Sequence, residues 1–238
     1  MENKKVGQNS KSQIPTEVCD KCRKENLAFG FTHLTSKDGG ACQKLCSECY
    51  NQFHAKQSGF PEPETVNFPP VMFHDSVGKA HIFYFDVRLS TGLGIKSFEL
   101  VDGSPGGYQF SVLEHPDTPV QEVYAKLYKK IEAGLAVRYI RSSDFGAELH
   151  HDRLYIKGAA VNGRICQRAD GTPIVIVDGV EYTWEEFGET LTSHEGFHFR
   201  LECFDQCEET GISPNPQRPD PVWWLAKTDL AEQEPQYH

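Results

Sequence analysis

The sequence lacks the features of a membrane-spanning or secreted protein. No stretch approaches the roughly 20 consecutive apolar residues that a membrane helix needs, and residues 1–16 are polar, unlike a signal peptide. A phosphate-binding loop, a dinucleotide fingerprint and a nucleophile elbow are also missing, so the enzyme classes built on them have no support. The eight cysteines do not form a secreted disulfide framework, because five of them gather between residues 19 and 49. We expect a cytoplasmic protein whose thiols stay reduced.

Basic charge is scarce in most of the chain, which limits its partners. The net charge is −10. Residues 1–60 contain 9 Lys and Arg against 6 Asp and Glu, whereas residues 61–238 contain 15 against 28. An acidic body repels the phosphate backbone of nucleic acids. Nucleic-acid binding therefore stays open as a prediction only for the weakly basic N-terminal part.

Two Cys-x-x-Cys pairs dominate that N-terminal part. Cys19 and Cys22 are followed, after 23 residues, by Cys46 and Cys49. Two thiolates on one tight turn point at a single ion, and a second pair completes the tetrahedron that is typical of structural Zn²⁺ sites. The spacing predicts one structural zinc ion bound by these four cysteines.

Cys42 leaves an alternative open. It lies four residues before Cys46, so it either replaces one of the four ligands or remains a free thiol. Four thiolates on Zn²⁺ leave a local charge of about −2. Four basic residues are close enough in sequence to offset this charge: Lys21, Arg23, Lys24 and Lys44.

The residues between the two pairs predict a hairpin and then a helix. Residues 28–34 and 41–45 have the pattern of strands, and residues 37–40, which include Asp38-Gly39, are typical of a turn. Ser47 can begin the helix, which places Cys46 and Cys49 in its first turn. Amides at a helix N-terminus favour thiolates.

This order of knuckle, hairpin and helix resembles the treble-clef type of zinc finger. The resemblance covers about residues 17–56, and residues 45–50 are its closest point. It implies zinc but no particular ligand. In such a module we expect Tyr50 and Phe53 on the inner side of the helix.

Composition divides the whole chain into five predicted segments. Prolines at 61, 63, 69 and 70 suit a stiff linker, and polar composition at both ends suits disorder. The segments are 1–16 (disordered), 17–56 (zinc-binding module), 57–70 (Pro-rich linker), 71–207 (second domain) and 208–238 (flexible tail).

The second domain is predicted to be α+β, with an antiparallel sheet and two main helices. Strand patterns at residues 81–89, 95–101 and 108–114 are separated by short loops, which favours a meander. The first of these strands has bulky residues on both faces. A helix opens at Thr118, the expected N-cap, with Gln121 completing a capping box. Its apolar stripe comprises Val120, Tyr124, Leu127, Ile131 and Leu135.

Three turn signals follow, at Asn162-Gly163, Asp170-Gly171 and Asp178-Gly179. They predict strands nearby at 164–167, 174–177 and 180–182, after a possible strand at 154–156. Residues 183–186 form a second capping box, which opens a helix through about Ser193 with Trp184, Phe187 and Leu191 facing inward. Alternation of apolar and polar residues predicts a last strand at 197–205.

His194-Glu195-Gly196-Phe197-His198 matches the HExxH pattern of zinc hydrolases. That chemistry requires a continuous helix, because only residues four apart aim both imidazoles at one ion. Gly196 is typical of a helix end, and the residues after it alternate like a strand. We therefore expect the two histidines on different elements, and we keep a metal-dependent hydrolase only as an alternative. Weaker metal candidates are Asp144, Glu148, His150, His151 and Asp152, and the set His198, Cys203 and Cys207.

The second domain also resembles an uncharacterised bacterial family. The resemblance covers most of residues 80–205 and implies no activity. It lies in residues 106–113 and in a Trp-Glu-Glu-Phe-Gly segment followed by Glu-Gly-Phe and a Phe- and Leu-containing stretch. The matching residues there are Trp184, Glu185, Glu186, Phe187, Gly188, Glu195, Gly196, Phe197, Phe199 and Leu201.

These observations favour a non-catalytic adaptor or regulatory protein. Its zinc module would act by protein–protein contact, with nucleic-acid binding through that module and metal-dependent hydrolysis as the two alternatives. The sequence sets neither the partner nor the oligomeric state. It also leaves open the role of Trp223 and Trp224 in the tail.

Overall fold

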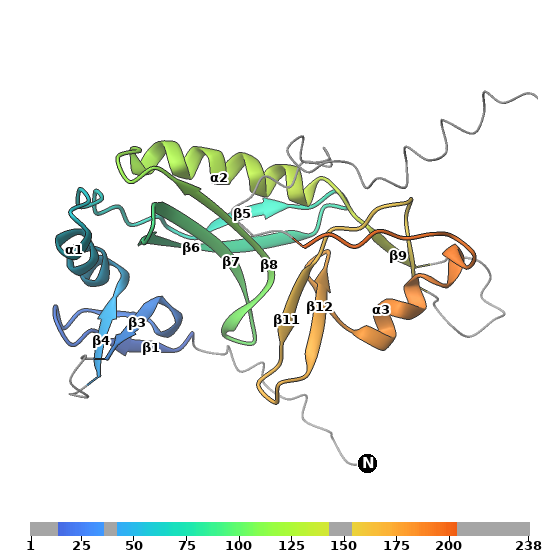
Figure 1. Cartoon of the computed structure of the whole chain (residues 1–238), viewed down its shortest axis with the longest axis horizontal. Coiled ribbons are helices and arrows are strands. Elements are labelled where there is room, and N and C mark those ends of the chain that lie inside the picture. The colour runs from blue at the N-terminus through green and yellow to red at the C-terminus, as the bar shows by residue number, and fades with distance from the viewer. Residues whose placement is uncertain (1–13, 36–41, 143–153, 204–238) are drawn as a thin grey trace, which may run out of the picture. The chain divides into compact units, whose positions relative to one another are not determined.

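The computed structural model describes residues 14–35, 42–142 and 154–203, which form an α+β fold of antiparallel sheets and helices (Figure 1). This confirms the predicted fold class. Within these residues no helix is long and apolar enough to cross a membrane.

The N-terminal part contains two hairpins and a helix. Strands β1 (Thr16–Val18) and β2 (Glu25–Leu27) pair with each other, and after a 3-10 turn (Ala28–Gly30) strands β3 (Phe31–Leu34) and β4 (Gln43–Cys46) pair in the same antiparallel way. The strand predicted at residues 28–34 therefore begins at Phe31, three residues later than predicted. The predicted turn at 37–40 lies outside the described residues.

Helix α1 (Ser47–Ser58) follows β4 directly and ends at Gly59, whose positive φ of 72° suits a glycine C-cap. Tyr50 is half-buried, but Phe53 is exposed, so its predicted inward orientation is wrong. Asn51 and Ala55 fill the inner side instead.

A four-stranded meander makes the main sheet, in the order β5-β6-β7-β8, as the short loops predicted. Its strands are β5 (Val71–His74), β6 (Ala80–Leu89), β7 (Leu93–Val101) and β8 (Ser104–Glu114). The turn between β7 and β8 is tighter than predicted, because it consists of Asp102 and Gly103, both at positive φ, as in a two-residue hairpin loop. Strand β8 consequently starts at Ser104, with a register shift opposite Phe98 and Glu99.

Helix α2 (Val120–Leu135) covers one face of this sheet over β7 and β8 (Figure 1). The predicted stripe is buried, with Val123 added and Tyr124 at its margin. It packs against Phe73, Phe83, Leu93 and Ile95. The predicted cap is wrong: Pro119 is the N-cap and makes no side-chain hydrogen bond.

A glycine inside α2 has a packing reason. Gly134 would cost about 1 kcal/mol relative to alanine in an exposed helix. Here a Cβ at Gly134 would lie 2.4 Å from Phe110 Cε1. The helix therefore approaches the sheet closely only because this side chain is absent.

His81 links three parts of the sheet below α2. The buried imidazole lies with Nδ1 2.7 Å from Glu99 Oε1 and Nε2 3.3 Å from Asp75 Oδ2. Asp75 also accepts hydrogen bonds from the N–H groups of Val77 and Lys79. Burial alone would raise the pKa of Asp75, but these N–H groups and the imidazole lower it below the ordinary 3.8.

The C-terminal described part contains two small sheets. Strands β9 (Ile140–Ser142) and β10 (Leu154–Ile156) pair with each other, and β11 (Arg164–Gln167), β12 (Pro173–Val177) and β13 (Val180–Thr183) form a three-stranded meander. All but β9 were predicted. Asp178 adopts a positive φ in the last turn, and its carboxylate accepts hydrogen bonds from the N–H groups of Tyr139 and Ile140.

Helix α3 (Trp184–Thr190) begins with the predicted capping box: the Glu186 N–H donates to Thr183 Oγ1, and the Thr183 N–H donates to Glu186 Oε2. It ends earlier than predicted, and a 3-10 turn follows at Thr192–His194. Trp184 and Leu191 are exposed, so their inward orientation is also wrong.

The predicted last strand does not form in residues 197–203. No strand in the described part of the chain pairs with them, although their apolar side chains alternate as in a strand. Phe197, Phe199 and Leu201 are 73%, 91% and 71% exposed. The remainder of the predicted strand lies outside the described residues.

Candidate metal centre

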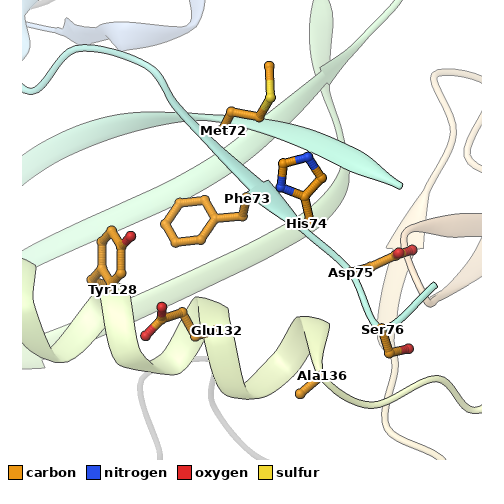
Figure 2. Close-up of a pocket in the computed structure, with 8 residues that line it drawn as sticks. All are labelled: Met72, Phe73, His74, Asp75, Ser76, Tyr128, Glu132 and Ala136. Carbon is orange, nitrogen blue, oxygen red and sulfur yellow. The ribbon is translucent and has the colours of Figure 1, made fainter. Parts of the chain in front are cut away.

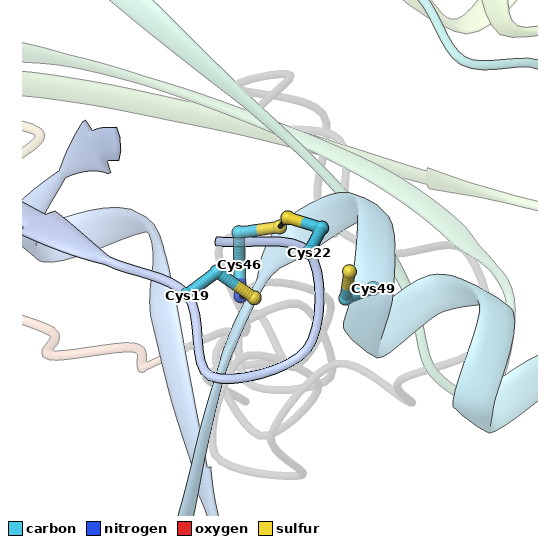
Figure 3. A group of neighbouring side chains, drawn as sticks. All are labelled: Cys19, Cys22, Cys46 and Cys49. Atoms are coloured by element: carbon cyan, nitrogen blue, oxygen red, sulfur yellow. Dashed lines mark hydrogen bonds between the residues drawn. The ribbon is translucent and has the colours of Figure 1, made fainter. Parts of the chain in front are cut away.

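The first cysteine pair sits in the turn between β1 and β2. The N–H of Cys19 donates to Lys24 O and the N–H of Arg23 donates to Cys19 O, each at 3.0 Å. Arg23 closes this turn with a φ of 61°. The bonds fold the chain into a tight knuckle that turns the two thiol groups to one side (Figure 3).

The second pair comes from the junction of β4 and α1. Cys46 is the N-cap of α1, and Cys49 lies in its first turn. The knuckle and this junction are held together by backbone contacts: the N–H of Asp20 donates to Lys44 O at 2.9 Å, and the N–H of Lys44 donates to Asp20 Oδ2 at 2.7 Å.

The four sulfur atoms converge. All lie within 4.8 Å of one another, and Cys22 Sγ is 3.8 Å from Cys46 Sγ (Figure 3). A tetrahedral ion with Zn–S bonds of about 2.3 Å would separate its sulfurs by about 3.8 Å. Cys19, Cys46 and Cys49 are buried, with Leu45 packed beside them. The cluster can therefore hold one metal ion shielded from solvent.

The pKa values of Cys19, Cys46 and Cys49 are shifted in different directions. Burial would raise the pKa of Cys19, but backbone N–H groups of Cys22, Cys46 and Lys21 lower it to about 6. Burial raises the pKa of Cys46 and Cys49, and hydrogen bonds from neighbouring cysteines raise that of Cys49 further. Binding of a metal ion would therefore displace protons from the raised-pKa thiols of Cys46 and Cys49.

Three of the four basic residues around the cluster are engaged with groups of the same module. Lys24 Nζ lies 3.3 Å from Glu48 Oε2, and Lys44 Nζ lies 2.6 Å from Glu17 Oε2. Lys21 Nζ donates to the Gln52 side chain at 3.0 Å. The pKa of Lys24 is raised chiefly by Glu48, with smaller contributions from Cys22 and Cys46.

Helix α1 also binds the open part of a strand edge in the main sheet. Strand β5 pairs with β6 only from His74 opposite Ala80 to Val71 opposite Phe83. Beyond Phe83, no described strand pairs with this edge of β6. Asn51 is buried and occupies that edge: its Nδ2 donates to Val87 O at 2.9 Å, and the Leu89 N–H donates to its Oδ1 at 2.8 Å. One amide side chain thus takes the place of a neighbouring strand.

A polar contact beside Asn51 extends the interface. Arg88 Nη2 donates to Asp86 Oδ2 at 2.9 Å, Nη1 donates to Thr32 Oγ1, and the guanidinium lies 5.2 Å from the ring centre of Tyr50. The Ser47 hydroxyl at the start of α1 donates to Asp86. The contacts of Asn51 and Arg88 between the N-terminal part and the main sheet were not predicted. The positions of these two residues in the sequence do not distinguish them from polar residues on an ordinary surface.

Cys42 lies outside the cluster. It is exposed, and its Sγ is 3.7 Å from His33 Nδ1. The four converging sulfurs are those of the two Cys-x-x-Cys pairs.

The HExxH residues do not share a helix. His194 ends a 3-10 turn, and its Nε2 lies 2.9 Å from Gly158 O. Gly196 has a φ of 84°, and residues 197–203, which the structure describes, are in no helix. The weaker candidates between 144 and 152, and Cys207, lie outside the described residues. Of the described residues, only the two cysteine pairs form a group that could hold a metal.

Comparison with known families divides the chain into three. Residues 18–61 match a domain of unknown function (DUF7685), residues 64–136 match a second (DUF7686) and residues 144–208 match a third (DUF7713). No curated protein and no solved structure matches the chain. The first match covers the cysteine cluster and α1, and the second covers the main sheet and α2.

Proposed function

We propose that the protein is a non-catalytic, zinc-binding adaptor or regulator that acts through protein–protein contacts. The observation that carries the proposal is the convergence of four cysteine sulfurs at distances suited to one tetrahedral ion. Four sulfur ligands saturate Zn²⁺ and leave no position for a substrate, so the ion would be structural. We assign Cys19, Cys22, Cys46 and Cys49 as its ligands.

The order of knuckle, hairpin and helix supports a treble-clef-like module at residues 17–56, followed by a linker at 57–70 and the second domain at 71–207. A cytoplasmic location suits the proposal, because a reducing compartment keeps the four thiols available to the metal.

A protein partner is favoured over nucleic acid by the charges near the cluster. Three of the four basic side chains predicted to serve the module are held by Glu48, Glu17 and Gln52. Phosphate contacts would have to break these interactions. Hydrolysis is disfavoured because no helix spans the HExxH residues: a 3-10 turn ends at His194, and Gly196 has a positive φ.

Metal analysis of the purified protein tests the site. We expect one zinc per chain, lost in Cys46→Ser and retained in Cys42→Ser, the matched control for a neighbouring thiol. Zinc affinity should fall as the pH is lowered, because protons compete for the raised-pKa thiols of Cys46 and Cys49. Zinc retention by Cys46→Ser, or its loss from Cys42→Ser, would contradict the ligand assignment.

Partner capture tests the adaptor role. A native pull-down with the wild-type chain should retain a protein that Cys46→Ser loses and Cys42→Ser keeps. Salt-sensitive binding of an oligonucleotide, weakened when Lys21, Arg23 and Lys24 are neutralised, would instead support the nucleic-acid alternative. Two metals per chain with His194 and His198 as ligands would support the hydrolase.

A further inference from the structure

Strand β5 has an open edge. Within the described parts of the chain it pairs with β6 alone. The backbone groups of successive residues in an antiparallel pair alternate between the two edges. The Asp75 N–H donates to Lys79 O, on the β6 side, so Val71 and Phe73 also face β6. The backbone groups of Met72 and His74 therefore face outward and can bond another strand.

A cavity of about 520 Å³ lies alongside this edge, between β5 and α2 (Figure 2). Phe73 points into it and packs on Tyr128 of the helix, with ring centres 4.7 Å apart. Glu132 lies one turn further along α2. Its carboxylate has no hydrogen bond or ion pair with any residue that the structure describes. The α2 side of the edge thus offers an aromatic floor and a free negative charge.

The other side of β5 is apolar and uncovered. Met72 points away from α2 (Figure 2) and is 56% exposed. Its partner across the ladder, Ile82 of β6, is 47% exposed. Two large apolar side chains at paired positions beside an open edge form a surface that a further strand can extend.

Residues 197–203 have the complementary pattern. Phe197, Phe199 and Leu201 alternate with His198, Arg200 and Glu202, and the three apolar side chains are largely exposed. We call residues 197–203 the arm. It has the side-chain alternation of a half-buried strand, but no described strand pairs with it.

We propose that the arm of one copy adds as a strand to the β5 edge of a second copy. Phe199 and Leu201 would then extend the apolar surface of Met72 and Ile82. Arg200, which forms an ion pair with Glu202 in the single chain, would point into the cavity and exchange this partner for Glu132. This arrangement places the exposed apolar side chains of the arm and of the β5 edge on one face of the extended sheet: Phe197, Phe199, Leu201, Met72 and Ile82. On the other face it brings Arg200 and Glu132, which have opposite charges, together.

The partner at this edge is a second copy of the same chain, because one chain contains both parts of the interface. Each chain carries one arm and one open edge, so a two-fold dimer uses both arms and both edges and then closes. The exchange also covers two features that would otherwise favour aggregation, an unpaired edge and an apolar strand. The proposal does not depend on the zinc site.

Light scattering coupled to size-exclusion chromatography of the full-length chain tests the dimer. We expect a mass of twice 26.9 kDa. The double variant Phe199→Ser/Leu201→Ser should raise the dimer dissociation constant at least about tenfold, without unfolding the chain, because both side chains are exposed. Leu113→Ser, which removes an exposed apolar side chain from β8, is the matched control and should leave the dimer intact.

Charge reversal tests the contact itself. Glu132→Arg and Arg200→Glu should each weaken the dimer, and the double variant should restore it, which a merely structural role for either residue would not produce. Hydrogen exchange at the Met72 and His74 amides should slow on dimerisation. A wild-type chain that stays monomeric at all concentrations would overturn the proposal, as would a dimer indifferent to the arm variants or an arm that protects these amides within a monomer.

Discussion

Replacing Asn51 by alanine would remove the side chain that joins α1 to the main sheet. Two backbone groups of β6 would lose their partners, the Val87 carbonyl and the Leu89 N–H. A buried group left without a hydrogen bond costs about 1–3 kcal/mol. Since Val87 is only half-buried, water can replace part of one bond. We therefore expect the free energy of unfolding to fall by about 2–4 kcal/mol.

Urea titration followed by far-ultraviolet circular dichroism measures this loss, with the wild-type and variant proteins compared at equal metal content. Gln52→Ala is the matched control, because it places alanine at the next position of the same helix and removes an exposed bond to Lys21. We expect its effect to stay within about 0.5 kcal/mol. Equal unfolding midpoints for the two variants would refute the view that Asn51 substitutes for a strand at this edge.

Three further predictions concern parts of the fold outside this contact. Thr183→Ala removes the side-chain acceptor for the Glu186 N–H and should lower the free energy of unfolding by about 1 kcal/mol in thermal or urea unfolding. Gly179→Ala should lower it by about 1–3 kcal/mol, because φ is 71° there and a Cβ would lie 2.6 Å from the Tyr108 ring; a neutral result would contradict the close contact. Asp75 has a lowered pKa, so its contribution is present above the ordinary value of 3.8 and is lost as the pH falls below it. Asp75→Asn should therefore show a smaller loss of stability than wild type between neutral and acidic pH, and an unchanged pH dependence would count against this role.

Local signals predicted most of the secondary structure. Asp178-Gly179 formed the turn that its chemistry demands, with both residues at positive φ. The stripe of α2 is buried, and the capping box of α3 is present. Each of these depends on residues within a few positions of one another, which a sequence displays directly.

The predictions that failed depend on contacts far apart in the chain. Strand β9 exists because Ile156 and Asp178 lie beside it, not because of its own pattern. Helical spacing predicted that Phe53 faces inward, but Asn51 lies on that side of α1, where it bonds to the edge of the main sheet. The arm has a strand pattern and lacks a described partner. For the candidate site, the Cys-x-x-Cys spacing predicted which sulfurs converge, while the identity of the metal stays a prediction.

The start of α1 combines two tasks within a few residues. Cys46 and Cys49 belong to the metal cluster, and Asn51, one position after Tyr50, belongs to the sheet edge. Unwinding the first two turns of this helix would disperse the thiols and bare Val87 and Leu89 in the same event. If the cluster holds the zinc ion proposed above, loss of that ion would expose an unpaired strand edge, and the supply of zinc would then affect the solubility of the protein as well as its fold.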